Sequence, residues 1–170
     1  GLKKIRDDHG QRALAAYGCA KGSNEEAYLL QKLVRTGFGS NNVDHCTRLC
    51  HASSVSALLE GIGSGAVSNP FTDVTDSDVI FLIGANPVSN HPVAATFIKN
   101  ATKNGTKLIL ADPRRSELAR HATHFLQFRP DTDVAMLNAM MHTIISEGLV
   151  DENYVSRYTN GFEELKANLE

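Results

Sequence analysis

Cysteine is scarce in this sequence, and long apolar runs are missing. The 170 residues contain three cysteines, Cys19, Cys46 and Cys50. Three thiols are too few for a disulfide framework or a four-thiolate metal site, a usage typical of a reducing compartment. The longest apolar run has seven residues, 79–85, whereas a helix that spans a bilayer needs about 20. We therefore expect no membrane insertion.

The sequence also lacks a large excess of positive or negative residues. Lys and Arg number 17 and Asp and Glu number 19, so the formal net charge is −2. No basic stripe follows the chain that would neutralise a row of phosphates, which argues against nucleic acid as a partner. The hydrophobic share of 42% and the charged share of 21% are ordinary for a soluble globular protein. The composition therefore predicts one domain or two small lobes rather than a disordered chain.

Both ends of the sequence favour a piece of a longer polypeptide. The chain begins with Gly1 instead of Met, and it stops at Glu170 inside a helical pattern without a capping residue. We accordingly expect the remainder of the same polypeptide to be a partner of this chain, and we expect the isolated piece to be inactive.

Hydrophobic periodicity predicts strands and helices that alternate along the chain. In the first part we expect a helix over 2–9, a strand over 13–17, a helix capped by Asn24 that ends near 37–39, and a short helix capped by Ser53 or Ser54 that ends at 61–65. In the second part we expect strands over 79–84, 107–111 and 125–128, and helices that begin at Pro92, Ser116 and Asp131, with two short helices around Tyr154 and Phe162. Residues 40–50 show no pattern.

This alternation predicts a fold class. Crossovers of this length favour an α/β fold with a doubly wound, mostly parallel sheet and helices on both faces, which is Rossmann-like. The strand over 79–84 is almost wholly apolar, as is typical of strands buried on both faces of a parallel sheet. Ligands of such sheets bind beyond the carboxyl ends of the strands, so the loops after 79–84 and 107–111 are the first places to look for a site.

Two loops follow those strands. In the first, 84–92, Gly84 lets the backbone approach a ligand and the next helix presents free amides, although the loop lacks the GxGxxG pattern and equally suits a turn stiffened by two prolines. In the second, Asp112 can accept ribose hydroxyls and Arg114 can meet phosphate or stack on a base, or the arginines are simply solvated. A third segment offers Asp131 or Asp133 as a helix cap or as a partner for the edge of a guanine.

The remaining chemistry lies in the segment 44–51. Cys50 stands beside His51 and just before a predicted helix, surroundings that favour a reactive thiolate, which is also a soft metal ligand. A zinc site from Cys46, Cys50, His45 and His51 is an alternative, but the spacing fits no common zinc motif. Burial without a chemical role is the simplest expectation for Cys19 and Cys46. A protease-like cysteine–histidine pair is disfavoured because adjacent residues rarely point at each other.

Taken in order, these motifs resemble one family. The run 41–55, with its Cys50-His51 pair, resembles the active-site segment of the catalytic alpha subunit of molybdenum- or tungsten-dependent formate dehydrogenases, which are molybdopterin oxidoreductases. The downstream motifs Gly84-Ala85-Asn86-Pro87 with His91-Pro92, Asp112-Pro113-Arg114-Arg115 and Pro130-Asp131-Thr132-Asp133 resemble that family's pterin-cofactor loops. The likeness runs from about His9 to the end of the chain.

The resemblance implies a cofactor and a set of roles. It implies a bis(molybdopterin guanine dinucleotide) cofactor with Mo or W, whose metal is bound by Cys50, a position that selenocysteine fills in some relatives. It further implies that His51 handles a proton or orients formate while formate is oxidised to carbon dioxide. The implied cofactor-binding residues are Gly84, Asn86, Pro87, His91, Asp112, Arg114 and Asp133.

The sequence departs from the family in several places. Asp131 stands where relatives often have glycine, and Ala52-Ser53 replaces a Gly-Pro pair found in several members. The family's cysteine motif for a [4Fe-4S] cluster, its substrate-binding arginine and its C-terminal cofactor domain are not in these residues, so we expect the cluster in the parent chain and not here. The lobe boundary is expected near Cys46: 1–45 would belong to a first α/β lobe and 46–170 to an incomplete lobe that binds the guanine dinucleotide.

Three functions remain open. The first is a formate dehydrogenase in the cytoplasm that passes electrons to partner subunits. The second is another molybdopterin oxidoreductase, similar to nitrate reductase. The third is a metal-free nucleotide-binding scaffold subunit, against which Cys50 argues, because a subunit without the metal has no use for a thiolate ligand followed by histidine.

Overall fold

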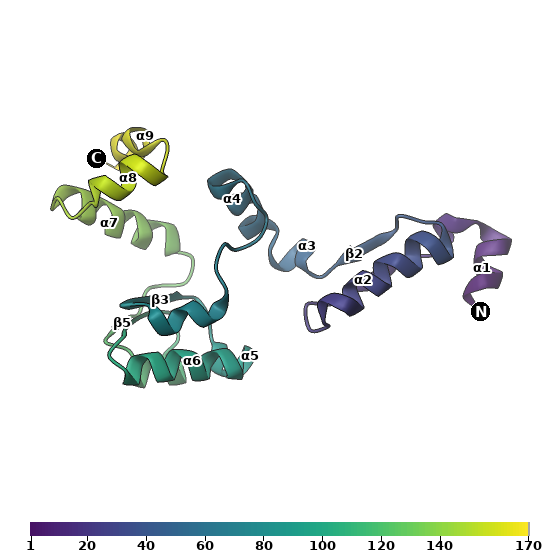
Figure 1. Ribbon diagram of the computed structural model, residues 1–170, viewed down its shortest axis with the longest axis horizontal. Coiled ribbons are helices and arrows are strands. Elements are labelled where there is room, and N and C mark those ends of the chain that lie inside the picture. The colour runs from purple at the N-terminus through teal and green to yellow at the C-terminus, as the bar shows by residue number, and fades with distance from the viewer. Residues whose placement is uncertain (170) are drawn as a thin grey trace. The chain divides into compact units, whose positions relative to one another are not determined.

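The computed structural model describes residues 1–169 and consists of two compact units, one over Gly1–Ser68 and one that begins at Asn69 (Figure 1). Each unit has its own parallel sheet, of two strands in the first unit and three in the second. The predicted α/β class with parallel strands is thus confirmed. The units are defined by internal contacts, and the lobe boundary expected near Cys46 stays a prediction.

The first unit contains two short paired strands, and a helix connects them along the chain. Its elements are α1 (Leu2–His9), a 3-10 turn (Gln11–Ala13), β1 (Ala16–Gly18), α2 (Asn24–Lys32), β2 (Val43–His45), α3 (Thr47–Cys50) and α4 (Ala52–Ile62). Strands β1 and β2 are parallel, and Gly18 pairs with His45. The strand expected over 13–17 therefore begins later, because residues 11–13 form the 3-10 turn.

The N-cap of helix α2 lies one residue before the predicted cap, so the helix begins at Asn24 itself. Ser23, not Asn24, is the N-cap: its hydroxyl accepts from the Glu26 amide, and the Glu26 carboxylate accepts from the Ser23 amide at 2.7 Å. This reciprocal pair satisfies two amides that a helix start otherwise leaves open. Beyond Lys32 the chain continues as a π-helical segment, Leu33–Phe38, which ends at Gly39 in a left-handed conformation. The end predicted near residues 37–39 is confirmed.

Two elements after α2 differ from the sequence-based expectation. Residues 43–45 form β2 although the polar stretch 40–50 shows no strand pattern. Helix α4 begins at Ala52 with His51 at the N-cap and no side-chain cap bond, so neither Ser53 nor Ser54 caps it. The helix ends at Gly63, whose φ of 69° suits glycine, within the predicted range.

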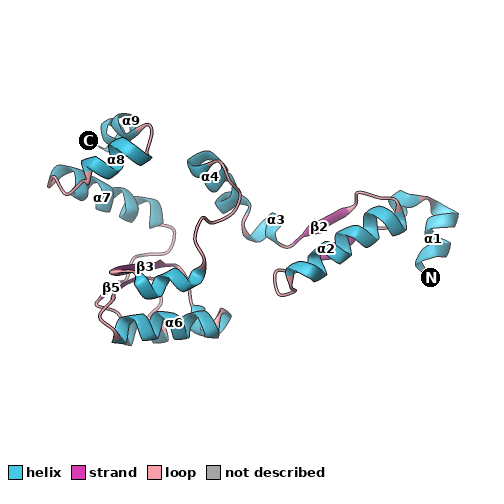
Figure 2. Cartoon of the chain, in the orientation of Figure 1, coloured by secondary structure: helices cyan, strands magenta, loops and turns pink. Residues whose placement is uncertain are grey.

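The second unit contains the longer sheet. Its elements are a 3-10 segment (Phe71–Asp76), β3 (Val79–Ile83), α5 (Pro87–Asn90), α6 (Pro92–Lys103), β4 (Lys107–Ala111), a 3-10 turn (Glu117–Arg120), β5 (His124–Leu126), α7 (Asp133–Ser146), α8 (Glu152–Tyr158) and α9 (Phe162–Leu169). The strand order is β3-β4-β5, all parallel, and Figure 2 shows α6 beside this sheet. The predicted strand over 107–111 and the helix start at Pro92 are confirmed.

The core of the second unit lies on one face of its sheet. Leu108 and Leu110 on β4 have no exposed surface, and Leu110 packs with Leu118 of the following 3-10 turn. Alternate positions face the other way, because side chains along a strand point to opposite faces. There Val79 is 51% exposed and Phe81 39%. Strand β3 was expected to be buried on both faces, but within the described chain Ile80 and Leu82 are half-buried and Val79 and Phe81 are exposed. The expectation is therefore wrong for the described residues.

Helix α7 begins two residues later than predicted. Its first residue is Asp133, and Asp131 lies before it with φ of 65°, the one non-glycine residue of 1–169 in the left-handed region. A residue in this conformation cannot be the first residue of a right-handed helix. Residue 131 is also the position where the family resemblance places glycine in many members, and glycine adopts this φ without steric cost.

This conformation gives a testable expectation for stability. In the full-length protein, Asp131→Gly should leave the free energy of unfolding unchanged or raise it by up to about 1 kcal/mol, because glycine removes the Cβ that a left-handed residue must accommodate. The midpoint of thermal unfolding should then stay the same or rise. The matched variant Asp131→Ala keeps a Cβ and loses the polar side chain, so its midpoint should fall below that of the glycine variant. Equal midpoints for the two variants would contradict the reasoning.

Candidate functional site

The turn after β2 carries the cysteine–histidine segment. Asp44 fixes this turn with both carboxylate oxygens: one accepts the His45 amide at 2.8 Å, and the other accepts Arg48 Nε at 2.9 Å. The amide bond first, and then the bond from Arg48, lower the pKa of Asp44 below its usual value of 3.8. Asp44 is therefore a carboxylate at neutral pH, and it ties the end of β2 to α3.

The His45 ring is held inside this turn. Its Nδ1 accepts the Thr47 amide at 3.2 Å and lies 2.7 Å from the Thr47 hydroxyl. Accepting an amide leaves the proton of the neutral ring on Nε2. The ring also lies over Gly18 of β1, where an added Cβ would stand 2.8 Å from His45 Cδ2. Gly18 is thus the residue that lets the ring approach, which the sequence alone did not reveal.

Cys50 and His51 lie side by side between two helices. Cys50 ends α3, and its amide bonds the Cys46 carbonyl at 3.1 Å; His51 follows, and its carbonyl accepts the Val55 amide of α4 at 2.7 Å. Both residues are exposed. Within residues 1–169 neither side chain has a hydrogen-bond partner, so the backbone is fixed while the thiol and the imidazole stay available.

The structure also bears on the zinc alternative at residues 45–51 and on the expected burial of Cys19 and Cys46. Among the described residues no group of three or more His, Cys, Asp or Glu side chains is placed to hold a metal ion. Cys46 is half-buried, whereas Cys19 is exposed, so the expectation of a buried Cys19 is wrong. Its position in the turn after β1 leaves it open to solvent.

The carboxyl edge of the β3-β4-β5 sheet brings Gly84 and Asp112 together. The register aligns Ile83 with Ala111 and Ala111 with Leu126, and the Gly84 amide extends the ladder by bonding the Ala111 carbonyl at 2.9 Å. The Asp112 amide does the same with the Leu126 carbonyl at 3.1 Å. Gly84 has φ of 56° and open space where a Cβ would stand. The backbone at Gly84 is therefore open to close approach, and its role in binding a ligand stays a prediction.

Asn86 holds an unpaired buried oxygen in the first loop. Its Nδ2 donates to the Ser89 hydroxyl at 3.1 Å, but its Oδ1 is buried and has no partner in the part of the chain that the structure describes. Pro87 is buried as the first residue of α5, and His91 is exposed between α5 and α6. A buried acceptor without a donor is costly, and a bound ligand that donates a hydrogen bond would satisfy it.

The second loop combines an acid with an arginine. The Asp112 carboxylate accepts the Arg114 amide at 2.7 Å, which folds the loop back on itself. The exposed Arg114 guanidinium has no ion pair in residues 1–169, whereas Arg115 lies over the Phe125 ring at 5.1 Å. The Arg114 guanidinium is thus free for an anion. Arg115 differs from it by its contact with the Phe125 ring.

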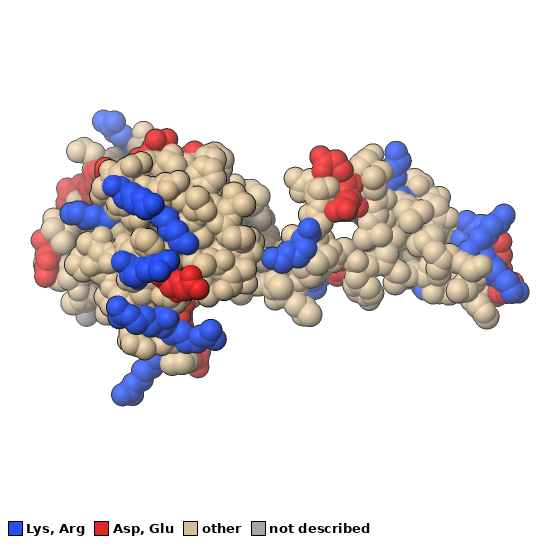
Figure 3. Space-filling model, turned by 90° about the horizontal axis from the view of Figure 1, so that it is seen from below, with Lys and Arg blue, Asp and Glu red and all other residues tan. Residues whose placement is uncertain are grey.

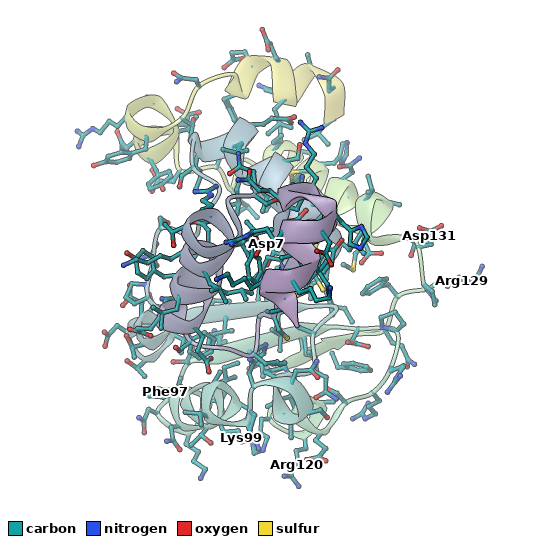
Figure 4. All side chains as sticks on the ribbon, turned by 90° about the vertical axis from the view of Figure 1, so that its right-hand side faces the viewer. Asp7, Phe97, Lys99, Arg120, Arg129 and Asp131 are labelled. Atoms are coloured by element: carbon teal, nitrogen blue, oxygen red, sulfur yellow. The ribbon has the colours of Figure 1, made fainter. Side chains whose placement is uncertain are left out.

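The third segment is placed at the start of α7. Asp133 is half-buried at the first helical position and does not cap the helix. Thr132 is at the N-cap, and its hydroxyl donates to the Arg129 carbonyl at 2.7 Å. In Figure 4 the side chains of Arg129 and Asp131 lie along the loop that leads into α7. The Asp133 carboxylate accepts no hydrogen bond within the described chain, which leaves it available to a ligand.

Sequence reasoning missed Ser116. This residue follows the acid–arginine loop and precedes the 3-10 turn Glu117–Arg120, and its buried Oγ has no partner among residues 1–169. It resembles Asn86 in this respect, since both are buried oxygens close to the carboxyl edge of the sheet. The signal was its position two residues after Arg114, but serine before a short helix is ordinarily read as a cap.

Basic residues also gather on the second unit, where Figure 3 shows several Lys and Arg side chains on one face. His121 lies among them: burial first, and then the charges of Arg120, Lys99 and Lys103, lower its pKa below 6.5. Arg120 Nε lies 3.2 Å from His121 Nε2, a bond that needs an unprotonated acceptor nitrogen. His121 is therefore neutral at pH 7.

A match over nearly the whole chain identifies the class of protein. Residues 1–167 match the family described as molybdopterin oxidoreductase, and the chain belongs to that family. The family implies a molybdopterin cofactor with molybdenum or tungsten. The structure of the described residues contains no helix long and apolar enough to cross a membrane.

Individual relatives narrow the comparison. The chain is 44% identical to F420-dependent formate dehydrogenase 1 subunit alpha of Methanococcus maripaludis, over 91% of this chain and 23% of that protein. It is 39% identical to formate dehydrogenase H of Escherichia coli, over 99% of this chain and 24% of that protein. It is 37% identical to the assimilatory nitrate reductase catalytic subunit of Bacillus subtilis, over 95% and 23%. The chain thus spans about a quarter of the length of these relatives.

A solved structure supports the fold. Acetylene hydratase from Pelobacter acetylenicus superimposes with a TM-score of 0.68 at 29% identity, over 99% of this chain and 23% of that one. The likeness extends through both units, since the matched share is nearly the whole chain. The resemblance to a molybdopterin oxidoreductase expected from the ordered motifs is therefore confirmed at the level of the family.

The described residues fit the family's cofactor. A molybdopterin carries phosphate, so it is anionic, and it is rich in hydrogen-bond donors and acceptors. The carboxyl edge of the sheet offers such a group the unpaired Asn86 oxygen, the free Arg114 guanidinium and the open approach at Gly84. In the first unit the exposed Cys50 thiol is a soft ligand suited to a transition metal.

Proposed function

We propose that the full-length protein that contains this chain is a formate dehydrogenase and that this chain carries its metal-binding cysteine. The observation that carries the proposal is the exposed Cys50-His51 pair on a fixed backbone, in a chain 44% identical to a formate dehydrogenase alpha subunit. Formate gives carbon dioxide, one proton and two electrons. A site for this reaction therefore needs an electron acceptor and a group that handles the proton.

Cys50 and His51 supply the protein's share of that chemistry. The cofactor, when bound, supplies the metal that takes up the two electrons. The Cys50 sulfur would be the one protein ligand of the metal, because a thiolate binds soft or high-valent transition metals well. The neighbouring His51 imidazole would hold or release the proton and orient the formate carboxylate. His45 differs from His51 because its Nδ1 is already occupied by the Thr47 amide.

The nucleotide end of the cofactor is assigned to the second unit. We propose the guanine dinucleotide form, with Asn86, Asp112, Arg114 and Asp133 as its polar partners. Arg114 would meet phosphate, and the carboxylates would accept from ribose or from the edge of guanine. Gly84 admits the backbone approach, while Pro87 and His91 shape the loop around α5. Ser116, whose buried oxygen is unpaired, joins this set.

Further parts of the enzyme lie outside this chain. We propose a [4Fe-4S] cluster in the rest of the parent polypeptide and electron-transfer subunits as partners, because the two electrons released from each formate need an acceptor. The few cysteines support a reducing compartment, the cytoplasm.

A second candidate function is another redox reaction on the same scaffold. The 37% identity to an assimilatory nitrate reductase catalytic subunit favours it. A proton-handling histidine directly after the cysteine suits the loss of a proton and two electrons from formate, and it gives the first proposal its advantage. A metal-free scaffold subunit is not supported, because it has no use for the exposed thiol of Cys50.

One experiment separates these functions. The full-length protein, purified anaerobically, should contain about one molybdenum or tungsten per chain and reduce an artificial acceptor dye when formate is added. Nitrate reduction by a dithionite-reduced dye, without formate oxidation, would establish the second function. A protein free of both metals, from cells that make the cofactor, would establish the scaffold reading.

A further inference from the structure

Two cysteines without a role in the proposed reaction stand at corresponding positions after paired strands. The parallel register of β1 and β2 pairs Gly18 with His45, so the next residue on each side is Cys19 on one strand and Cys46 on the other. The Cys46 amide bonds the Gly18 carbonyl at 3.3 Å and carries the pairing one residue further. Neighbouring strands lie about 4.8 Å apart, a separation that a disulfide can bridge.

The Cys46 sulfur already points toward the chain at Cys19. It accepts the Ala20 amide at 3.1 Å. Only two covalent bonds separate that amide nitrogen from the Cys19 Cα, which therefore lies within about 5.5 Å of the Cys46 sulfur. To bring the two sulfurs together, the Cys19 side chain must turn about its Cα–Cβ bond and the Cys46 side chain must adjust toward it. Staggered rotamers make the turn easy for an exposed side chain.

The two thiols differ in exposure, and this sets their order of reaction. Cys19 is exposed and meets an external reagent first, whereas Cys46 is half-buried behind the loop that follows β1. An exposed thiol that forms a mixed disulfide is resolved by a second thiol close by. Cys46, whose sulfur lies beside the chain at Cys19, is placed to be this second thiol. It precedes α3, whereas Cys50 is the last residue of that helix.

We propose that Cys19 and Cys46 form a reversible thiol–disulfide pair whose oxidant is a small-molecule disulfide of the glutathione class. The Cys19 thiolate attacks one sulfur of the oxidant, which forms a mixed disulfide and releases one thiol. The Cys46 thiolate then attacks the Cys19 sulfur, forms the Cys19–Cys46 bond and releases the second thiol. Two cysteine thiols are oxidised and one disulfide is reduced, so electrons and atoms balance. The pair does not depend on the formate assignment.

The sequence makes the product easy to identify. Trypsin cuts after Lys and Arg, which places Cys19 in peptide 13–21, Cys46 in peptide 36–48 and Cys50 in peptide 49–99. The full-length protein is incubated with oxidised glutathione, its remaining thiols are alkylated, and the digest is read by mass spectrometry without reduction. We expect peptide 13–21 joined to peptide 36–48, and we expect dithiothreitol to separate them.

Three variants sharpen the test. Cys19→Ser should abolish the linked peptides, and Cys50→Ser should leave them. Cys46→Ala should raise the glutathione adduct on Cys19 more than about tenfold over the wild type, because the resolving thiol is gone. Cys19 is exposed, so its substitution does not disturb the core. A link between peptides 36–48 and 49–99 instead, or a stable Cys19 adduct in the wild type with no link, would overturn the proposal.

Discussion

A Cys50→Ala variant of the full-length protein is expected to lose formate-dependent dye reduction by at least about 100-fold. Loss of a residue that only orients a metal ligand already lowers metal affinity or activity about 10- to 100-fold, and loss of the ligand itself should cost no less. The fold should survive, because the Cys50 side chain is exposed and has no hydrogen-bond partner within residues 1–169.

The measurement has two readouts and a matched control. Metal content per chain and the initial rate with formate are determined for the wild type, Cys50→Ala and Cys19→Ser, the last of which also removes one exposed thiol. Under reducing conditions Cys19→Ser should behave like the wild type. A Cys50→Ala enzyme that turns over formate at the wild-type rate would remove Cys50 from the site, and with it the main support for the proposed function.

An Asn86→Leu variant should show opposite effects on cofactor binding and on the stability of the cofactor-free protein. Leucine has nearly the same shape but no buried oxygen to leave unpaired, so the cofactor-free protein should be as stable as the wild type or more stable, by up to about 2 kcal/mol. The cofactor would lose one acceptor, and its affinity should fall about tenfold. Ordinary damage to the fold would lower both quantities together.

The control for this experiment changes the residue that the Asn86 amide nitrogen contacts. Ser89→Ala removes the partner of Asn86 Nδ2, at 3.1 Å, and leaves the buried Oδ1 in place. Cofactor retained after gel filtration and thermal unfolding of the cofactor-free protein are compared for the two variants. Retention should fall in Asn86→Leu and stay near the wild-type level in Ser89→Ala. Equal losses in both would mean that Asn86 acts by shaping the loop and not through its oxygen.

The sequence predicted the second unit better than the first. Strand β4 and the start of α6 were predicted to the residue because an apolar run and a proline at the first helical position are strong local signals. Strand β2 was missed because its three residues, Val43–His45, include two polar ones and take their strand conformation from pairing with β1. Ser23 was missed as a cap because its neighbour Asn24 is an equally good capping residue by type.

The sequence likewise predicted some features of the candidate site and not others. Gly84 and Asp112 were brought together by the rule that parallel strands end at one edge, and the structure aligns them as expected. The unpaired oxygens of Asn86 and Ser116 could not be predicted, since burial and missing partners depend on the packing of distant residues. The positive φ of Asp131 is likewise a property of the folded loop.

The strand order of the second sheet has a consequence for synthesis on the ribosome. Because the order β3-β4-β5 follows the chain, each strand emerges next to the edge on which it will pair, and no later strand has to insert between two earlier ones. Strand β4 can pair with β3 as soon as β4 itself has left the exit tunnel, and only 12 residues separate the end of β4 from the start of β5. Short separations along the chain favour rapid pairing. This unit can therefore grow in the N-to-C direction while the ribosome is still translating the rest of the polypeptide.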